Sequence, residues 1–243
     1  MRLSLLTMLF ALPVAAVAAD PPPPWSGEAS AGAIVTTGNT ESKSFNAKGE
    51  VIYNSKLWRN TLNGQALNTS TTDPVTDVQT RTAERYLLGN KTDFNFTDRD
   101  YAFLALEGEK DLYGPTRERT SETIGYGRKI LTGPLHTLEA EIGGGARQTE
   151  EQVTEETNSD AIARGRVAYK WAFSETSHFA QTVKVESGDS NTFTESVTEL
   201  RVSLVGKLFA LASYTARNNS DVQPDVEKTD TITTINLGWS FGK

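Results

Sequence analysis

The chain has 243 residues, no cysteine, two histidines and a formal net charge of −7 at pH 7. Without cysteine it has no disulfide framework, no cysteine-ligated zinc site and no thiol nucleophile. His136 and His178 are the two histidines, so a three-histidine metal centre is excluded as well. The acidic balance argues against a nucleic-acid partner, because phosphates attract clustered lysine and arginine. Composition alone is that of an acidic, polar protein.

The first 19 residues have the layout of a secretory signal peptide. Arg2 is followed by a mostly apolar run over residues 3–14 and by small residues up to Ala19. This run is shorter than the roughly 20 residues of a membrane-spanning helix, so we expect cleavage near Ala19 and export. Residues 20–26 contain four consecutive prolines and are expected to form an extended periplasmic lead-in. A single domain is expected over residues 27–243.

The rest of the chain alternates apolar and polar residues with a period of two, which is typical of β-strands. Near the C-terminus, for example, Ile235, Leu237 and Trp239 share one face, and Asn236 and Ser240 share the other. Most such segments are about 10–14 residues long, whereas globular strands have about 5–6. Turn residues divide the chain into twelve segments, which start near Gly27, Ser42, Leu57, Thr80, Asp100, Arg117, Leu135, Asn158, Ser177, Thr192, Lys207 and Thr229.

The connections between these segments alternate between tight turns and longer polar loops. Tight turns are expected around residues 54–56, 97–99, 131–134, 174–176 and 205–207. Longer loops are expected at residues 68–79, 112–116, 148–158, 187–191 and 218–228, with a short exception at 38–41. This pattern predicts an all-β fold: a transmembrane, antiparallel up-and-down β-barrel of about 12 strands, as in outer membranes.

A closed barrel can span hydrocarbon because its backbone N–H and C=O groups all pair between strands. The apolar face is expected to contact lipid, and it carries Phe45, Val51, Leu138, Ile142, Val167 and Leu237. An aromatic girdle belongs at the membrane interface. Its expected members, near the tight turns on the periplasmic side, are Tyr53, Tyr169, Trp171, Trp239 and Phe241.

The opposite face of the strands would line the lumen and is rich in charge. Its charged residues are Lys48, Glu50, Arg59, Arg85, Lys91, Asp93, Glu107, Glu109, Glu139, Glu141, Arg147, Arg164, Arg166, Lys170, Lys184, Glu186, Glu195, Glu199, Arg201, Arg217 and Asp230. One interpretation is a polar pore or a ligand site, and the other is an ion-pair network that fills a narrow barrel. Twelve strands lie between filled barrels of about 8 strands and open porins of about 16. This size favours a filled or narrowly open lumen.

Residues 149–160 form an acidic segment with Glu150, Glu151, Glu155, Glu156 and Asp160 and no basic residue. Calcium prefers such oxygen ligands, but the spacing is not that of a calcium-binding loop. We therefore favour a solvated loop whose like charges repel one another.

A catalytic role is disfavoured. A serine hydrolase needs a base within hydrogen-bond reach of its nucleophile, and the sequence has no Gly-x-Ser-x-Gly motif. His136 and His178 both lie next to tight turns, which would place them at the periplasmic rim. Lipid-acting enzymes of the outer membrane usually work on the outer leaflet instead. We expect no catalytic residue, no metal and no cofactor.

Several stretches carry a family resemblance: TTGNTESKSFNAKGEV at Thr36–Val51, TAERYLLGNKTDFNFTDRDYAF at Thr82–Phe103, VKVESGDSNTFTESVTELRV at Val183–Val202, and YTARNNSD with KTDTITTINLGWSF near the C-terminus. In this order they resemble the YdiY-like family of salt-induced outer-membrane proteins. The resemblance implies an outer-membrane barrel of a Gram-negative bacterium, with a link to salt or osmotic conditions. It implies no catalytic residue and no ligand.

One residue breaks the pattern of the predicted lipid face. Arg128 shares the parity of Ile124 and Tyr126, where an apolar side chain is expected. It lies close to the tight turn at residues 131–134, so its guanidinium could reach the interface.

We therefore expect an outer-membrane protein of structural or narrow-channel type. Its expected partners are outer-membrane lipid, lipopolysaccharide and the barrel-assembly machinery, which would recognise the C-terminal strand ending at Phe241. The alternatives are a soluble, exported, lipocalin-like binding barrel with its apolar face inside and, less favoured, an outer-membrane lipid-acting enzyme. Strands of about ten residues favour the membrane barrel.

Overall fold

The computed structural model describes residues 24–36, 41–73, 76–223 and 226–242. The predicted signal peptide, most of the proline-rich lead-in and most of the predicted turn at residues 38–41 lie outside the described residues. Within those residues, no helix has both the length and the apolar character needed to cross a membrane.

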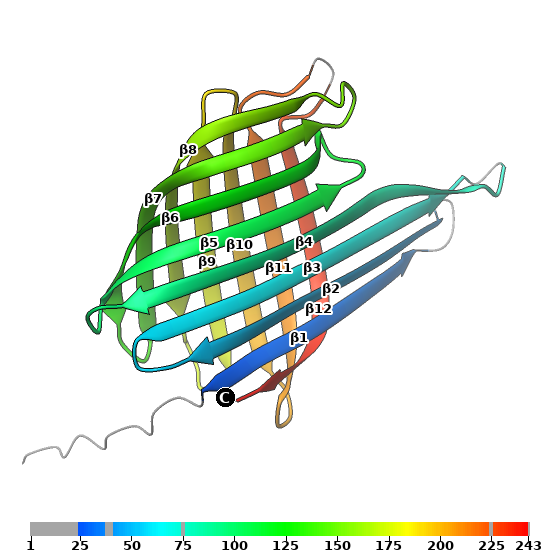
Figure 1. Cartoon of the computed structure of the whole chain (residues 1–243). Coiled ribbons are helices and arrows are strands. Elements are labelled where there is room, and N and C mark those ends of the chain that lie inside the picture. The colour runs from blue at the N-terminus through cyan, green and yellow to red at the C-terminus, as the bar shows by residue number, and fades with distance from the viewer. Residues whose placement is uncertain (1–23, 37–40, 74–75, 224–225, 243) are drawn as a thin grey trace, which may run out of the picture.

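Twelve strands form one closed antiparallel barrel, in which each strand pairs with its neighbours in the chain and β1 pairs with β12 (Figure 1). The predicted fold class is confirmed, and every predicted strand start agrees within two residues. The strands are β1 (Trp25–Thr36), β2 (Glu41–Asn54), β3 (Trp58–Thr72), β4 (Gln79–Asn95), β5 (Asp100–Asp111), β6 (Thr116–Thr132), β7 (His136–Glu151), β8 (Thr157–Trp171), β9 (Ser177–Ser187), β10 (Thr192–Ser203), β11 (Leu208–Asn219) and β12 (Thr229–Phe241).

The barrel begins earlier than the predicted domain start at residue 27. Trp25 and Ser26 already belong to β1, where they pair with Tyr53 and Ile52 of β2. The ring centroids of Trp25 and Tyr53 are 4.8 Å apart. This aromatic contact and the backbone pairing fix the last two residues of the predicted lead-in as strand.

Two of the predicted long loops were wrong in extent. β3 continues to Thr72 and β4 begins at Gln79, so much of the predicted loop at 68–79 is strand. Likewise, β7 continues to Glu151 and β8 begins at Thr157. These segments are polar, but threonine has a high strand propensity, and the backbone of Thr72 still pairs with Glu41 across the hairpin.

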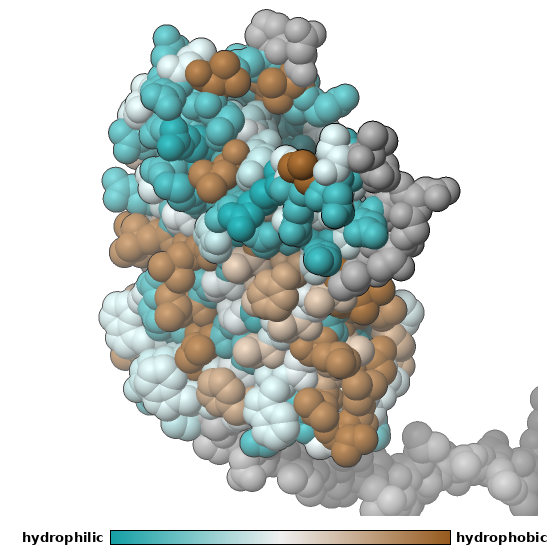
Figure 2. All heavy atoms as spheres, turned by 90° about the vertical axis from the view of Figure 1, so that its right-hand side faces the viewer, coloured by the Kyte–Doolittle hydropathy of each residue, from teal (hydrophilic) through white to brown (hydrophobic). Residues whose placement is uncertain are grey.

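Side chains alternate between the outside of the barrel and its interior. Ile142 and Leu237 are among the exposed outer residues, whereas their neighbours Glu141 and Asn236 are buried. On the face seen in Figure 2, hydrophobic side chains gather over the lower part and hydrophilic ones over the upper end. This is the opposite of a soluble barrel, which would bury its apolar face.

The two ends of the barrel differ. The tight-turn end carries the β2–β3, β4–β5, β6–β7, β8–β9 and β10–β11 turns, and it also holds the start of β1 and the end of β12. Aromatic rings gather there, and the ring centroids of Trp58 and Phe94 lie 4.9 Å apart. We call the other end the loop end. The aromatic residues therefore lie where the sequence pattern predicts an interfacial girdle.

Arg128 lies on the outside near the tight-turn end. Its guanidinium Nη1 is 3.0 Å from the Asp100 carboxylate, and its side chain stays half exposed. The hydroxyl of Tyr126 donates a hydrogen bond to the same carboxylate. Arg128, the one charged residue noted on the predicted lipid face, thus forms an ion pair with Asp100 beside the aromatic girdle.

Candidate functional site: the charged interior

A cavity of about 310 Å³ lies inside the barrel, and most of its lining residues are charged. Six basic and six acidic side chains line it, so their formal charges balance. They are Lys48, Glu50, Arg59, Lys91, Asp93, Glu107, Glu139, Arg164, Arg166, Lys184, Glu195 and Glu199. The strand period of two explains this lining, because every second residue of a strand points to the same side of the wall.

Glu109 of β5 is the centre of the most strongly linked group. Its carboxylate oxygens lie 3.1 Å from Nε of Arg85 on β4 and 2.7 Å from Nη2 of Arg119 on β6. Arg217 of β11 donates a further hydrogen bond to it. β5 and β11 lie on opposite walls of the ring of twelve strands. One carboxylate therefore holds three arginines and links opposite walls at this level.

A second carboxylate and an aromatic ring complete this group, which we call the Glu109 cluster. Glu195 of β10 lies 3.7 Å from Arg85 and 3.5 Å from Arg217. The Phe193 ring is 1% exposed, and the guanidinium of Arg119 lies 3.6 Å from its centroid. A cation over an aromatic face is stabilised by the quadrupole of the ring. Two carboxylates and one aromatic ring thus stabilise the positive charge of the three arginines.

Other ion pairs also cross the interior. Glu107 of β5 contacts Lys184 of β9 and lies 3.2 Å from Arg164 of β8. Lys48 of β2 pairs with Glu199 of β10. In each of these pairs, charged residues from well-separated strands meet at hydrogen-bond distance. These paired side chains therefore limit the free space between opposite walls of the barrel.

Glu141 forms a separate centre nearer the tight-turn end. Its carboxylate lies 2.6 Å from Nζ of Lys91 and 3.3 Å from Nη1 of Arg166. Tyr101 donates a hydrogen bond to it at 2.9 Å. Tyr101 also belongs, with Phe103 and Ala105, to the small buried apolar cluster on β5. The interior thus combines charge pairs with packed aromatic rings.

Near the loop end, the side chain of Arg147 is 2% exposed. Its Nη2 lies 3.0 Å from the Asp160 carboxylate and donates to the backbone carbonyl of Asn191 at 2.6 Å. Above it a second cavity, of about 750 Å³, is framed by the loops of this end. Its described lining carries no lysine or arginine, and its acidic residues are Glu151, Asp189, Asp221, Glu227 and Asp230.

The predicted acidic loop at residues 149–160 forms ion pairs with a basic residue outside it. Arg117 Nη1 lies 3.7 Å from Glu150 and 3.0 Å from Glu155. Gln223 donates a hydrogen bond to Glu151 at 2.6 Å. Across the described residues, histidines and carboxylates form no group of three or more able to hold a metal ion. A loop defined only by self-repulsion was therefore the wrong description, because a basic residue from β6 bridges it.

Three further charged residues predicted to line the lumen lie outside the groups described above. Glu186 is 1% exposed, and its carboxylate lies 3.9 Å from Lys184. Arg201 pairs with Glu28 of β1 and lies 3.6 Å from the centroid of the Phe209 ring. The register sets Lys170 opposite Thr137 of β7 and Ala180 of β9, at the tight-turn end.

Sequence reasoning missed four charged residues of these networks: Glu28, Arg119, Asp160 as a partner of Arg147, and Asp111, whose carboxylate lies 3.7 Å from Arg217. Arg119 is central, yet a register irregularity between Thr116 and Glu118 interrupts the alternation just before it. Arg119 is two residues from the buried Ser121, and residues two apart in a strand lie on the same face. This spacing could have assigned Arg119 to the interior. Glu28 lies inside the predicted first strand but was not assigned to the lumen face.

Both histidines lie at the tight-turn end, near the starts of β7 and β9. His136 Nδ1 lies 2.8 Å from the hydroxyl of Tyr169 in the neighbouring strand, at the tight-turn end. His178 lies opposite Arg201 in the register of β9 and β10.

The family model described as "Protein of unknown function, DUF481" matches residues 29–241 of this chain. "Uncharacterized protein YdiY" from Escherichia coli K12 is 31% identical over 219 residues, which cover 90% of this chain and 84% of that protein. These matches confirm the resemblance seen in the sequence.

Two solved structures have the same fold. The NanC porin superposes with a TM-score of 0.53 at 8% identity, covering 88% of this chain and 98% of that one. The COG4313 outer membrane channel from Pseudomonas putida F1 also gives 0.53 at 8% identity, covering 95% of this chain and 100% of that one. The barrel therefore has the fold of outer-membrane porins and channels.

Proposed function

Since the chain belongs to the DUF481 family and has the fold of outer-membrane channels, we propose that it acts as a narrow, charge-lined channel of the outer membrane. One observation carries the proposal: ion pairs cross the interior between a cavity of about 310 Å³ and a mouth of about 750 Å³. Small ions and small polar solutes could pass where side chains move apart, while larger solutes could not.

The orientation follows from the same proposal. The tight-turn end would face the periplasm, with the loop end outside, as is usual for barrels of this kind. An acidic mouth would raise the local concentration of cations, because a cleft lined with one sign of charge attracts counter-ions. The paired interior below it would then limit the rate of passage.

Partners and salt dependence belong to this proposal too. The outer face would contact outer-membrane lipid and lipopolysaccharide, and the assembly machinery would bind the strand ending at Phe241. Ionic strength weakens exposed ion pairs more than buried ones. At the loop end, the partly exposed pairs of Arg117 with Glu150 and Glu155 are therefore expected to respond to salt.

The second candidate is a barrel whose role is structural. The cross-barrel pairs of the Glu109 cluster favour it, because they brace opposite walls. Solute uptake by proteoliposomes, measured from low to high salt, separates the two. Uptake of small ions and polar solutes that exceeds that of protein-free liposomes supports a channel. Uptake equal to the protein-free rate at every salt concentration would leave the structural role.

A further inference from the structure

The seam that closes the barrel is shorter than the other strand pairings beside it. β1 and β12 share five residue pairs, from Gly27 with Phe241 to Ala31 with Leu237. β1 pairs with β2 over twelve residues, and β11 with β12 over eleven. In the described part of the chain, residues 32–36 of β1 therefore pair on one side only. Figure 1 shows β1 and β12 meeting near the C-terminus and diverging beyond that point.

The seam ends within the apolar zone. From Trp25 in the aromatic girdle to Ala31, the last paired residue, β1 advances six residues. At about 3.3 Å per residue this is about 20 Å along the strand. With a tilt of about 45° it corresponds to roughly half of an apolar band about 25 Å tall. The unpaired part of the seam thus lies in the half of the membrane nearer the loop end.

Unpaired strand edges are costly in hydrocarbon, and the end of the seam shows how the barrel manages them. Asn46 donates a hydrogen bond to the Gly32 carbonyl at 3.4 Å, and Asn236 donates to Ser30 Oγ at 3.3 Å. The alternation turns Ile34 toward the interior, yet this side chain is 46% exposed. The interior side of β1 is therefore uncovered where the seam has ended.

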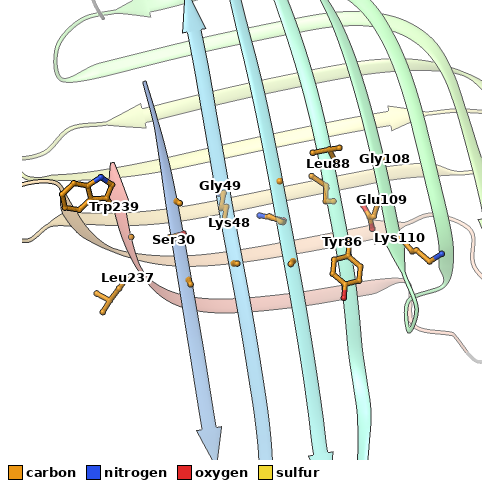
Figure 3. Close-up of a pocket in the computed structure, with 18 of the residues that line it drawn as sticks. Ser30, Lys48, Gly49, Tyr86, Leu88, Gly108, Glu109, Lys110, Leu237 and Trp239 are labelled. Atoms are coloured by element: carbon orange, nitrogen blue, oxygen red, sulfur yellow. The ribbon is translucent and has the colours of Figure 1, made fainter. Parts of the chain in front are cut away.

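A groove of about 1120 Å³ runs along the outer wall beside this point. Its floor is made of small residues on β1, β2 and β3: Ala29, Ala31, Ala47, Gly49, Gly64 and Ala66. The register places these residues side by side across the three strands. Leu237 and Trp239 of β12 stand along one side, and Tyr86 and Leu88 of β4 along the other (Figure 3).

The shape of the groove selects its occupant. Beyond Tyr86 and Leu88 the lining continues over Gly108 and Lys110 of β5 and Glu118 and Thr120 of β6. Bulky side chains stand on both sides of the part of the floor formed by β1, β2 and β3, so the convex wall of a second barrel cannot reach the floor there. A hydrocarbon chain can, because it is narrow and flexible. The floor is apolar and lies at the level of the membrane, where acyl chains surround the protein. An acyl chain of a membrane lipid therefore fits the groove better than a protein partner does.

Near the end of the seam, the groove and the interior lie on the two sides of one wall. A small cavity of about 40 Å³ lies on the other side of the same wall, and it shares Ala47 and Ala66 with the groove. Leu67, Ile232 and Asn236 also line it. Its volume is close to that of one water molecule, about 30 Å³, so the passage is closed in this state. A Cβ on Gly32 would meet the backbone oxygen of Ile235 and the Asn236 side chain.

We propose that the loop-end half of the seam between β1 and β12 is a lateral portal, through which the acyl chain of an outer-leaflet lipid enters from the groove toward the barrel interior. Gly32 is the contact at which the portal closes. The inference goes beyond the proposed channel and is independent of it, because a portal can admit an acyl chain whether or not ions cross the barrel.

The seam itself can be tested by crosslinking, because the chain has no cysteine of its own. Ala31→Cys with Leu237→Cys joins the last registered pair. Ala33→Cys with Ile235→Cys would join the next outward-facing pair if the register continued. We expect the first pair to oxidise readily in proteoliposomes and the second to stay reduced under the same conditions. Equal oxidation of both pairs would mean a continuous seam and would overturn the portal.

Entry of the acyl chain can be tested by fluorescence quenching. A fluorophore on Ser213→Cys would lie beside the small cavity, and one on Thr182→Cys would lie on the interior side away from the seam. The probe is a phospholipid vesicle in which part of the lipid carries a quenching spin label on its acyl chain. We expect a larger loss of fluorescence at position 213 than at position 182. Equal losses at the two positions would contradict entry.

Two further variants keep the test sharp. Gly32→Ala should force the strands apart and increase the quenching at position 213, whereas Gly165→Ala, whose Cβ would meet nothing within 4 Å, should leave it unchanged. Ala47→Cys on the floor of the groove reports a second copy of the chain. If it forms a disulfide-linked dimer of intact barrels in the membrane, the occupant is a protein and the proposal is wrong. We expect this variant to remain monomeric.

Discussion

Arg217 on β11 reaches across the barrel and donates a hydrogen bond to Glu109 on the opposite wall. Both side chains are almost fully buried, and Arg85 and Arg119 bind the same carboxylate. The barrel is therefore held at one level by a negative charge among three positive ones. Removing one partner of a buried ion pair leaves an uncompensated charge, which is usually more costly than the pair is stabilising.

The first prediction concerns that carboxylate. Glu109→Gln keeps the shape of the side chain but leaves Arg85, Arg119 and Arg217 to repel one another. We expect the free energy of unfolding to fall by about 3–5 kcal/mol, as measured by urea titration in detergent micelles. The matched control is Glu118→Gln, whose pair with Lys110 is exposed and should contribute at most about 1 kcal/mol. Equal losses in the two variants would contradict the account of the cluster.

The Phe193 ring is expected to affect both the stability of the barrel and the width of its interior. Phe193→Ala removes a fully buried ring beneath Arg119, and such a truncation typically costs about 3–5 kcal/mol. If the barrel is a channel, we also expect a larger single-channel conductance, because the ring fills part of the interior beside the Glu109 cluster. Phe45→Ala, on the outer face, is the control for conductance, which it should leave unchanged.

The pair between Lys48 and Glu199 allows a double-mutant cycle. Lys48→Glu and Glu199→Lys should each destabilise the barrel, since each places like charges together across the interior. The double charge swap should recover part of the loss, with a coupling energy of about 0.5–3 kcal/mol. Strictly additive effects of the two single variants would show that the pair makes no direct contribution.

Gly127 provides a test of packing around Tyr101. A Cβ at Gly127 would overlap the Tyr101 ring, whose hydroxyl donates to Glu141. Gly127→Ala is therefore expected to lower the free energy of unfolding by about 1–3 kcal/mol, the usual effect of overpacking. At Gly108 a Cβ would meet nothing within 4 Å, so Gly108→Ala should leave the unfolding transition in place. A transition shifted only by Gly108→Ala would contradict the described packing.

The period of two was enough to predict twelve strands. It could not predict which charges meet, because partners such as Glu109 and Arg217 depend on how the sheet closes. The short β1–β12 seam was beyond sequence analysis for the same reason. Arg119 was missed where the register shifts in β6. The loop at 68–79 was overestimated because polar residues such as Asn68 and Thr72 continue the strand outside the apolar band.

The acidic mouth gives a prediction about selectivity. Replacing Asp189, Asp221 and Asp230 with asparagine removes three of the acidic groups at the mouth. We expect the reversal potential in a salt gradient to shift toward weaker cation preference, because fewer counter-ions gather there. Replacing Asp98, which lies in the tight turn between β4 and β5, is the control at the opposite end. The prediction does not survive if the triple variant keeps the wild-type reversal potential.

The most direct test of the central claim is single-channel recording of the refolded protein in planar bilayers. Wild-type protein should give small, discrete conductance steps, and Glu109→Gln should change their size or their anion-to-cation ratio. Steps of wild-type size and selectivity in the variant would show that ions do not pass the Glu109 cluster. A complete absence of steps in every salt, from protein shown to be folded and inserted, would contradict the channel itself.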